Sequence, residues 1–292
     1  MIRIWKIIYK VGSYINSKIN SSKNKREEKK WLNKFGKNER IIFECNDTFK
    51  IYLYKNSILS KYINIGFEKN EREFVINFLK KGDVFYDIGA NIGLFSLLAS
   101  KVVGEKGLVY SFEPTPITYS RLLDNISLNN FSNIKTFNIG LSDKVGKLNL
   151  NVSTNGYDAW NSFAKINDKL YEYTVEIEVN SLDNFLANHN KNISLIKIDV
   201  EGWELFVLKG GEQLLKTSTE IVLLVEFTDE NAFAAGYYSH ELFDLLISWG
   251  YEWFSYENKQ LNKEIRRLYY PYLNLIAAKN ENFLREKLKI NY

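Results

Sequence analysis

The chain of 292 residues has little of several residue types, and each shortage argues against a class of protein. Its one cysteine, Cys45, cannot form an internal disulfide, and the sequence contains no cysteine–histidine pattern for zinc. Three prolines and sixteen glycines leave little room for low-complexity linkers. No apolar run reaches the roughly 18 residues that a membrane span needs. Because Lys6 and Lys10 interrupt the first apolar stretch, we expect no signal peptide and a reducing, cytoplasmic location.

The composition that remains is ordinary for a globular protein. Hydrophobic residues make up 45% of the chain and charged residues 25%, which argues against wholesale disorder. A chain of this length can bury a large core. We therefore expect one α/β domain, with or without an extension.

Charge is distributed unevenly along the chain. Residues 1–40 contain twelve basic and three acidic residues, a net charge of +9, whereas the remaining 27 basic and 32 acidic residues give −5. In this arm, apolar residues recur every three or four positions opposite a basic and polar face, as in a helix that lies on a membrane surface. We expect a helical arm over 1–40 that contacts an anionic surface, such as the inner membrane face, or packs on the protein itself. Its apolar stripe consists of Ile4, Ile7, Ile8, Val11, Tyr14 and Ile15.

From residue 41 onward, apolar strands alternate with helices. Two short strands flank a predicted turn at Asn46 and Asp47, and a helix over 71–81 is predicted to end at Gly82. The later strands are nearly continuous apolar runs, typical of a mostly parallel sheet covered on both faces. The predicted fold class is therefore α/β, a doubly wound, Rossmann-like sheet. Its expected strands are 84–89, 108–114, 134–140, 195–199, 221–227, 251–257 and 274–279, and its expected helices are 94–103, 117–130 and 241–250; the two short strands that precede it are 41–45 and 49–54.

A long stretch separates the expected strands 134–140 and 195–199. Two segments in it, 147–153 and 175–179, alternate as half-exposed strands and predict a β-hairpin. The aromatic and amide-rich segment 155–165 between them either faces a substrate or belongs to an ordinary surface hairpin. The domain over 41–292 then divides into an N-terminal part (41–81), a cofactor half (82–146), the insertion (147–192) and the second half of the sheet (193–292).

The segment DIGANIG, Asp87–Gly93, carries the strongest chemical signal. It follows an apolar strand and opens a helix, and Gly89 and Gly93 let the backbone turn sharply and approach a ligand. Such a turn lies at the carboxyl ends of parallel strands, where ligands bind. Its glycine spacing differs from the G-x-G-x-x-G of nicotinamide enzymes, which argues against a nicotinamide oxidoreductase.

Polar residues also end the next two strands. Glu113 lies 26 residues after Asp87, where a carboxylate can bind both hydroxyls of a ribose. Ser142 and Asp143 follow the third strand, where an adenine edge can be recognised. Three strand ends in register therefore predict a nucleoside-containing cofactor.

These segments resemble class I S-adenosylmethionine-dependent methyltransferases and, in detail, the FkbM family. The resemblance covers roughly residues 60–280 and leaves the arm outside. The combination of DIGANIG, FEP and KIDVEGWE at this spacing is specific. The matching segments are 82–99, 112–116, 125–130, 138–146, 180–186, 196–211, 223–227 and 274–279.

The resemblance implies S-adenosylmethionine as methyl donor and S-adenosylhomocysteine as product. It implies that the glycine turn holds the methionine and sulfonium part, that Glu113 binds the ribose, and that Ser142 and Asp143 flank the adenine. Glu68 matches a family glutamate that reaches the amino group, unless it is simply a solvated acid. The implied cofactor residues are Glu68, Asp87, Gly89, Ala90, Asn91, Gly93, Glu113, Pro114, Ser142, Asp143 and Asp199.

Carboxylates follow the fourth and fifth strands of the expected sheet, and we take Asp199, Glu226 and Glu201 as catalytic candidates. The sulfonium already activates the methyl group, so the protein must align donor and acceptor and remove a proton. Asp199 and Glu226 can serve as the base, which we favour slightly, or can share a Mg²⁺ ion. Asp199 can instead contact the cofactor or cap a helix, and Glu226 can pair with Lys197.

The resemblance points to O-methylation of a hydroxyl on a sugar or glycan, or on a secondary metabolite, and the basic arm suits a lipid-linked glycan. Candidate acceptor contacts are Tyr157, Trp160, Asn161 and Trp203, of which Trp203 departs from the family pattern. A nucleic-acid methyltransferase is the alternative, but the fourth strand lacks the Asn/Asp-Pro-Pro-aromatic turn and the body is acidic. A non-catalytic cofactor-binding scaffold is a third possibility, and the strand-end carboxylates argue against it.

Overall fold

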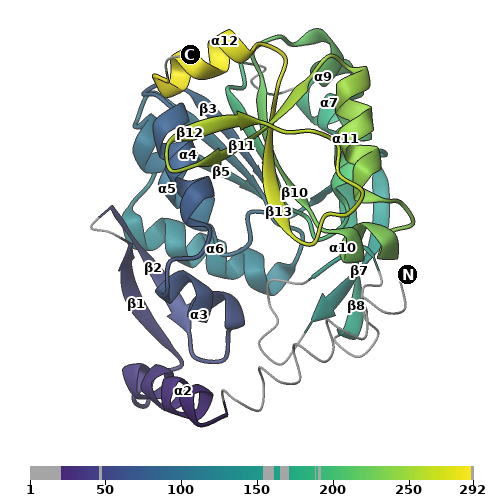
Figure 1. Ribbon diagram of the computed structural model, residues 1–292. Coiled ribbons are helices and arrows are strands. Elements are labelled where there is room, and N and C mark those ends of the chain that lie inside the picture. The colour runs from purple at the N-terminus through teal and green to yellow at the C-terminus, as the bar shows by residue number, and fades with distance from the viewer. Residues whose placement is uncertain are drawn as a thin grey trace.

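The computed structural model describes residues 21–45, 48–153, 161–164, 171–187, 189 and 192–290 (Figure 1). Eight strands of the described part form one central sheet in the order β12-β11-β13-β10-β9-β3-β4-β5. The five strands from β10 to β5 in this order are parallel to one another, whereas β13 pairs antiparallel with β10 and with β11, and β12 with β11. The strands are β3 (Val84–Ile88), β4 (Leu108–Phe112), β5 (Ile134–Phe137), β9 (Leu195–Ile198), β10 (Val222–Phe227), β11 (Glu252–Glu257), β12 (Gln260–Lys263) and β13 (Leu273–Ala278).

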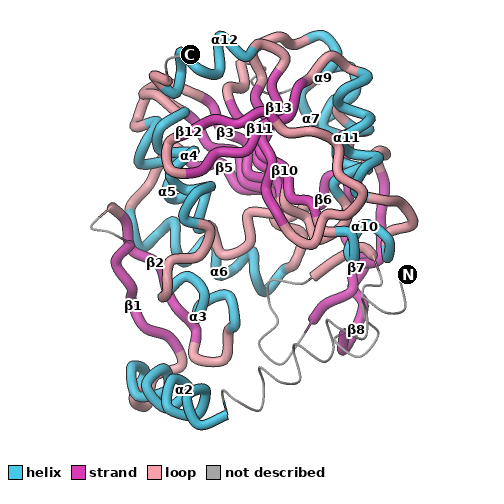
Figure 2. The backbone as a smooth tube through the Cα atoms, in the orientation of Figure 1, coloured by secondary structure: helices cyan, strands magenta, loops and turns pink. Residues whose placement is uncertain are grey.

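Helices cover both faces of this sheet (Figure 2). Successive side chains of a strand point to opposite faces, and neighbours such as Phe85 and Tyr86 therefore belong to two separate hydrophobic cores. The predicted doubly wound α/β fold is confirmed. One core packs against α4 (Lys69–Phe78), α5 (Leu94–Val103) and α12 (Glu281–Leu288), with α6 (Pro116–Asn129) on the same side; the other packs against α7 (Leu182–Leu186), α8 (Glu204–Gly210), α9 (Glu212–Thr217), α10 (Asp229–Ala234) and α11 (Ser239–Ser248).

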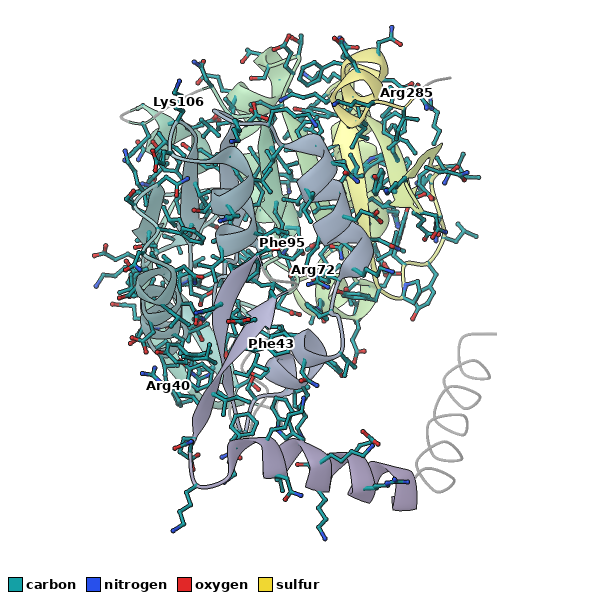
Figure 3. All side chains as sticks on the ribbon, turned by 90° about the vertical axis from the view of Figure 1, so that its left-hand side faces the viewer. Arg40, Phe43, Arg72, Phe95, Lys106 and Arg285 are labelled. Atoms are coloured by element: carbon teal, nitrogen blue, oxygen red, sulfur yellow. The ribbon has the colours of Figure 1, made fainter. Side chains whose placement is uncertain are left out.

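The N-terminal elements form a layer at the end of the molecule opposite α12 (Figures 1 and 3). They are α2 (Ser21–Phe35), the antiparallel pair β1 (Arg40–Cys45) and β2 (Phe49–Tyr54), and α3 (Ile58–Asn64). Trp31 and Phe35 are buried in the first core, and the indole of Trp31 donates a hydrogen bond to the Lys55 carbonyl at 2.8 Å. The second half of the predicted arm thus packs on the body. Its apolar stripe and the predicted turn at Asn46 and Asp47 lie outside the described residues.

The predicted hairpin is present beside the main sheet. The strands β7 (Gly146–Ser153) and β8 (Tyr171–Asn180) pair antiparallel, and the short β6 (Gly140–Leu141) pairs parallel with β8. A bridge between Asn151 and Ser162 holds the described segment 161–164 against β7. The Ser162 hydroxyl also donates to the Glu201 carbonyl at 2.6 Å, so this returning segment lies beside the turn that follows β9.

Two predicted boundaries are wrong. The helix predicted over 71–81 ends at Phe78, because the buried Leu79 is already extended and Asp83 accepts a hydrogen bond from the Lys80 amide at 2.8 Å. The strand predicted over 134–140 is two strands in two sheets. Asn138 separates them, since its side-chain amide donates to the carbonyls of Glu113 and Pro114 at 2.8 and 2.9 Å. No described helix is both long and apolar enough to cross a membrane.

Candidate functional site

A cavity of about 520 Å³ opens at the carboxyl ends of β3, β4, β9 and β10. Its walls also include residues 139–141, the returning segment 161–163, and two side chains from distant parts of the chain, Glu68 and Tyr272. Parallel strands bring their carboxyl ends to one edge, so residues far apart in sequence meet there. The cavity therefore lies where the sequence predicted a ligand.

The glycine turn between β3 and α5 forms the floor beside β9. Gly89 has a φ of +85°, and a Cβ built on it would lie 1.8 Å from the carbonyl oxygen of Asp199. The amides of Gly89 and Ala90 donate to the Phe112 carbonyl at 3.0 and 2.9 Å. Gly93, by contrast, is the N-cap of α5 and packs against Leu122, so it shapes the turn rather than the described cavity wall.

Asp87, at the end of β3, is 1% exposed and lines the cavity. Its Oδ2 accepts a hydrogen bond from the Ser96 hydroxyl at 2.5 Å, whereas Oδ1 has no hydrogen-bond partner among the described residues. Burial raises the pKa of Asp87, and the positive charge of Lys197 opposes that rise. One oxygen of this carboxylate is thus available to a ligand.

Glu113, at the end of β4, has both oxygens engaged. Oε2 accepts from the Asn91 amide at 3.0 Å, and Oε1 accepts from the Thr115 amide at 2.8 Å. Burial raises the pKa of Glu113 to about 7, although these hydrogen bonds favour the charged form. Glu113 and Pro114 line the cavity, and Glu113 also fixes the two loops beside it. Its predicted contact with a ribose stays a prediction.

Ser142 and Asp143 lie away from the described cavity wall. Ser142 is fully buried; its hydroxyl donates to Asp143 Oδ1 at 3.0 Å and accepts from the Trp203 indole at 3.1 Å. The break after Phe137 turns the chain into β6, and it is residues 139–141 that reach the cavity instead. The adenine contact predicted for Ser142 and Asp143 stays a prediction.

Of the predicted acceptor residues, too, some line the cavity and others do not. Asn161 lines the cavity, where Oδ1 accepts from the Ser153 amide at 2.8 Å and Nδ2 donates to Thr115 Oγ1 at 3.1 Å. Trp203 is not among the described lining residues, because its ring stacks on Phe206 with centroids 4.1 Å apart. Its predicted acceptor contact stays a prediction. Tyr157 and Trp160 lie outside the described residues.

Glu68 does reach the cavity and is more than a solvated acid. It is the N-cap residue of α4 with a φ of +48°, and its Oε1 accepts from the Tyr272 hydroxyl at 3.1 Å. Burial raises the pKa of Glu68 to about 7, with Lys197 opposing the rise. Tyr272, which sequence reasoning missed, precedes β13, the strand next to β10, and lines the cavity beside Glu68.

The ends of β9 and β10 bring three carboxylates together. One oxygen each of Asp199, Glu201 and Glu226 lies within 4.8 Å of the others, and we call these three residues the acidic cluster. The Lys197 ammonium donates to Asp199 Oδ2 at 2.6 Å, so Lys197 pairs with Asp199 and not, as one alternative had it, with Glu226. Burial, and next the charge of Asp199, raises the pKa values of Glu201 and Glu226 well above the usual range.

The turn that carries Glu201 is held by Glu204, whose role the sequence did not reveal. Glu204 is buried, and its Oε1 accepts from the amides of Val200 and Gly202 at 3.0 and 3.1 Å. Its Oε2 accepts from the Tyr237 hydroxyl at 3.1 Å. Glu204 is the last residue of the motif KIDVEGWE. Only the folded structure shows that its carboxylate accepts hydrogen bonds from the backbone of the turn that precedes it.

Comparisons with known proteins show the family of the chain. The sequence model of the FkbM methyltransferase domain matches residues 87–253, more than half of the chain. Methyltransferase sdnD of Sordaria araneosa is 32% identical over 155 residues, 44% of this chain and 60% of that protein. Hexuronic acid methyltransferase AglP of Haloferax volcanii is 30% identical over 145 residues, 49% of this chain and 56% of that protein.

A solved structure, a SAM-dependent methyltransferase from Aquifex aeolicus, overlays with a TM-score of 0.41 at 15% identity. The overlay covers 75% of this chain and 96% of that one. The chain spans 56 to 60% of the length of the curated relatives it matches.

Proposed function

Because the chain belongs to the FkbM methyltransferase family, we propose that it transfers a methyl group from S-adenosylmethionine to a hydroxyl of a sugar, in a glycan or in a secondary metabolite. The observation that carries the proposal is the contact between the two halves of the cavity. The glycine turn, proposed to hold the donor, packs through Gly89 directly on Asp199 of the acidic cluster. Similarity to a hexuronic acid methyltransferase supports a sugar acceptor.

The residues around the glycine turn fit the proposed cofactor. Gly89 and Asp87 both line the cavity, and Asp87 Oδ1 has no hydrogen-bond partner within the described structure. We propose that Asp87 and the backbone from Gly89 to Asn91 bind the methionine part and that Glu113 binds the ribose. When bound, S-adenosylmethionine supplies a methyl group already activated by a sulfonium.

The acidic cluster lies on the acceptor side in this proposal. As the O–CH₃ bond forms and the S–CH₃ bond breaks, the bonding pair stays on sulfur and the hydroxyl proton must leave. The products are a methyl ether, S-adenosylhomocysteine and a proton. Asp199 and Asn161 line the same cavity and are proposed to orient the acceptor, since alignment contributes much of the rate in such a transfer.

A methyl-transfer assay tests the proposal. The full-length protein is incubated with methyl-labelled S-adenosylmethionine and separate pools of uronic-acid oligosaccharides, neutral oligosaccharides and RNA. We expect label in a sugar pool, with one S-adenosylhomocysteine formed per methyl group transferred. Label in RNA alone, or no calorimetric binding of S-adenosylmethionine, would overturn the proposal.

We propose further that the arm brings the enzyme to an anionic membrane at the cytoplasmic face, where lipid-linked glycans are accessible. The support is the opposed basic and apolar faces of residues 1–20, which lie outside the described structure.

A further inference from the structure

We infer that Asp199, Glu201 and Glu226 bind one divalent cation of the Mg²⁺ or Mn²⁺ type on the acceptor side of the cavity; this inference rests on the proposed function. One oxygen of each carboxylate lies within 4.8 Å of the others. Ligand distances of about 2.0–2.6 Å place the oxygens around a hard cation roughly 3–5 Å apart. The acidic cluster therefore needs little movement to surround such an ion.

An independent observation is the state of Glu226. This side chain is 4% exposed and lines the cavity, and its Oε2 has no hydrogen-bond partner in the described part of the chain. A buried carboxylate without a partner is costly, and native proteins therefore pair such groups or let them coordinate metals. Glu226 thus places a buried oxygen without a partner in the described structure next to two further carboxylates.

Lys197 does not supply that partner. Its ammonium is only 3% exposed and contacts Asp199 Oδ2 at 2.6 Å, so it leaves the second oxygen of Asp199 for another ligand. One lysine faces three clustered carboxylates, while Glu68 and Asp87 add two more acids to the same cavity wall. The charge around the acidic cluster therefore favours a cation.

The other two carboxylates are held in place. Glu201 Oε2 accepts from the Asn231 side-chain amide at 2.8 Å, which leaves Oε1 as a further oxygen. The Ser162 hydroxyl donates to the Glu201 carbonyl at 2.6 Å, so the returning hairpin segment also fixes this turn. A rigid set of oxygens loses little conformational freedom when it binds an ion, which favours affinity.

A cation at this position would act on the acceptor. It would lower the pKa of the acceptor hydroxyl, so that its proton leaves to water as the O–CH₃ bond forms and the S–CH₃ bond breaks. The bonding pair remains on sulfur, as before. A base of ordinary carboxylate strength is then unnecessary, because the hydroxyl itself has become more acidic.

Binding of the metal alone tests this inference. The full-length protein is stripped with EDTA, dialysed, and titrated with Mn²⁺ while free Mn²⁺ is followed by electron paramagnetic resonance. We expect one bound Mn²⁺ that Mg²⁺ displaces, with affinity reduced at least tenfold in Glu226→Gln and in Glu201→Gln. Glu220→Gln removes the same charge from an exposed position and should bind like the wild type. Unchanged affinity in Glu226→Gln, or no bound Mn²⁺, would overturn the inference.

Two further measurements separate this inference from the proposed function. Calorimetric affinity for S-adenosylmethionine, measured on each variant, shows whether the variant is folded. If sugar methylation persists fully in EDTA and the stripped protein binds no Mn²⁺, the cation site is wrong and the function stands. If Mn²⁺ binds through the acidic cluster but no sugar is methylated, the site stands and the proposed acceptor is wrong.

Discussion

Two buried glutamates on opposite sides of the cavity, Glu113 and Glu226, are held in opposite ways. On the side of β3 and β4, both oxygens of Glu113 accept backbone hydrogen bonds, so this carboxylate stabilises the loops around it. On the side of β9 and β10, Glu226 has an oxygen without a partner in the described structure, and Glu201 and Asp199 crowd beside it. A buried acid with satisfied oxygens shapes a site, whereas one with an unsatisfied oxygen is placed to receive a ligand.

The halves are nevertheless joined through Lys197. Burial opposes its charge, but Asp199, Glu68 and Asp87 together raise its pKa above the usual range. This lysine therefore stays protonated and interacts with acids from both halves. A substitution in one half of the cavity should therefore affect the other half least when it leaves the acidic partners of Lys197 unchanged.

The largest effect is expected where the halves touch. In Gly89→Ala the new Cβ would meet the Asp199 carbonyl oxygen, and the residue would keep a φ of +85°. We expect a loss of more than about 3 kcal/mol in unfolding free energy or in cofactor binding, measured by urea denaturation and calorimetry. Gly82→Ala is the control, because its φ of +93° is similar but its Cβ would meet open space. Equal losses in the two variants would show that strain, not contact between the halves, is responsible.

Removing the Glu113 carboxylate should weaken cofactor binding without affecting the acidic cluster. Glu113→Ala is expected to reduce S-adenosylmethionine affinity by about 1.5–3 kcal/mol, the range for a hydrogen bond to a charged group. Calorimetry measures this change, and Mn²⁺ binding at the acidic cluster should be unaffected. Wild-type affinity in Glu113→Ala would remove the ribose assignment.

The acceptor half is tested by Asp199→Asn, which keeps an oxygen for Lys197 but removes one charge. We expect methyl transfer to fall at least tenfold, about 1.4 kcal/mol, while the protein still folds. Turnover with the identified acceptor measures the effect, with Glu220→Gln as the matched control. A wild-type rate would exclude Asp199 from the mechanism.

The raised pKa of Glu113 predicts how stability depends on pH. This carboxyl has a pKa of about 7 in the folded protein and 4.5 as the reference value, so the folded state binds more protons between these values. Stability should therefore fall as pH rises from about 4.5 to about 7, by on the order of 1–2 kcal/mol. Urea unfolding of wild type and Glu113→Gln at pH 5 and pH 8 measures the difference. A wild-type slope no steeper than that of the variant would contradict the prediction.

Deleting the first part of the arm is expected to have the smallest effect on the two halves of the cavity. Deleting residues 1–20 should leave S-adenosylmethionine affinity unchanged, because the buried Trp31 and Phe35 remain to pack α2 on the body. The same deletion should abolish salt-sensitive binding to anionic vesicles. If the full-length protein does not bind such vesicles at low salt, the apolar stripe is better interpreted as an internal packing face.

Periodicity and motif spacing determined much of this protein in advance. Apolar runs predicted the parallel strands, since a strand buried on both faces must be hydrophobic throughout. Residues 87–92 of DIGANIG and Glu113 line the cavity as expected, because their positions follow from where a strand ends. The carboxylates Asp199, Glu201 and Glu226 were named for the same reason.

Tertiary structure decided what these side chains contact. Glu68 accepts a hydrogen bond from Tyr272, 204 residues away, and Glu204 accepts one from Tyr237, 33 residues away; the sequence indicated neither partner. Ser142 and Trp203, both predicted as ligand contacts, hydrogen-bond to each other although they lie 61 residues apart in the chain. Strand ends are local features that a sequence encodes directly, whereas the partner of a buried polar group depends on elements brought together from across the fold.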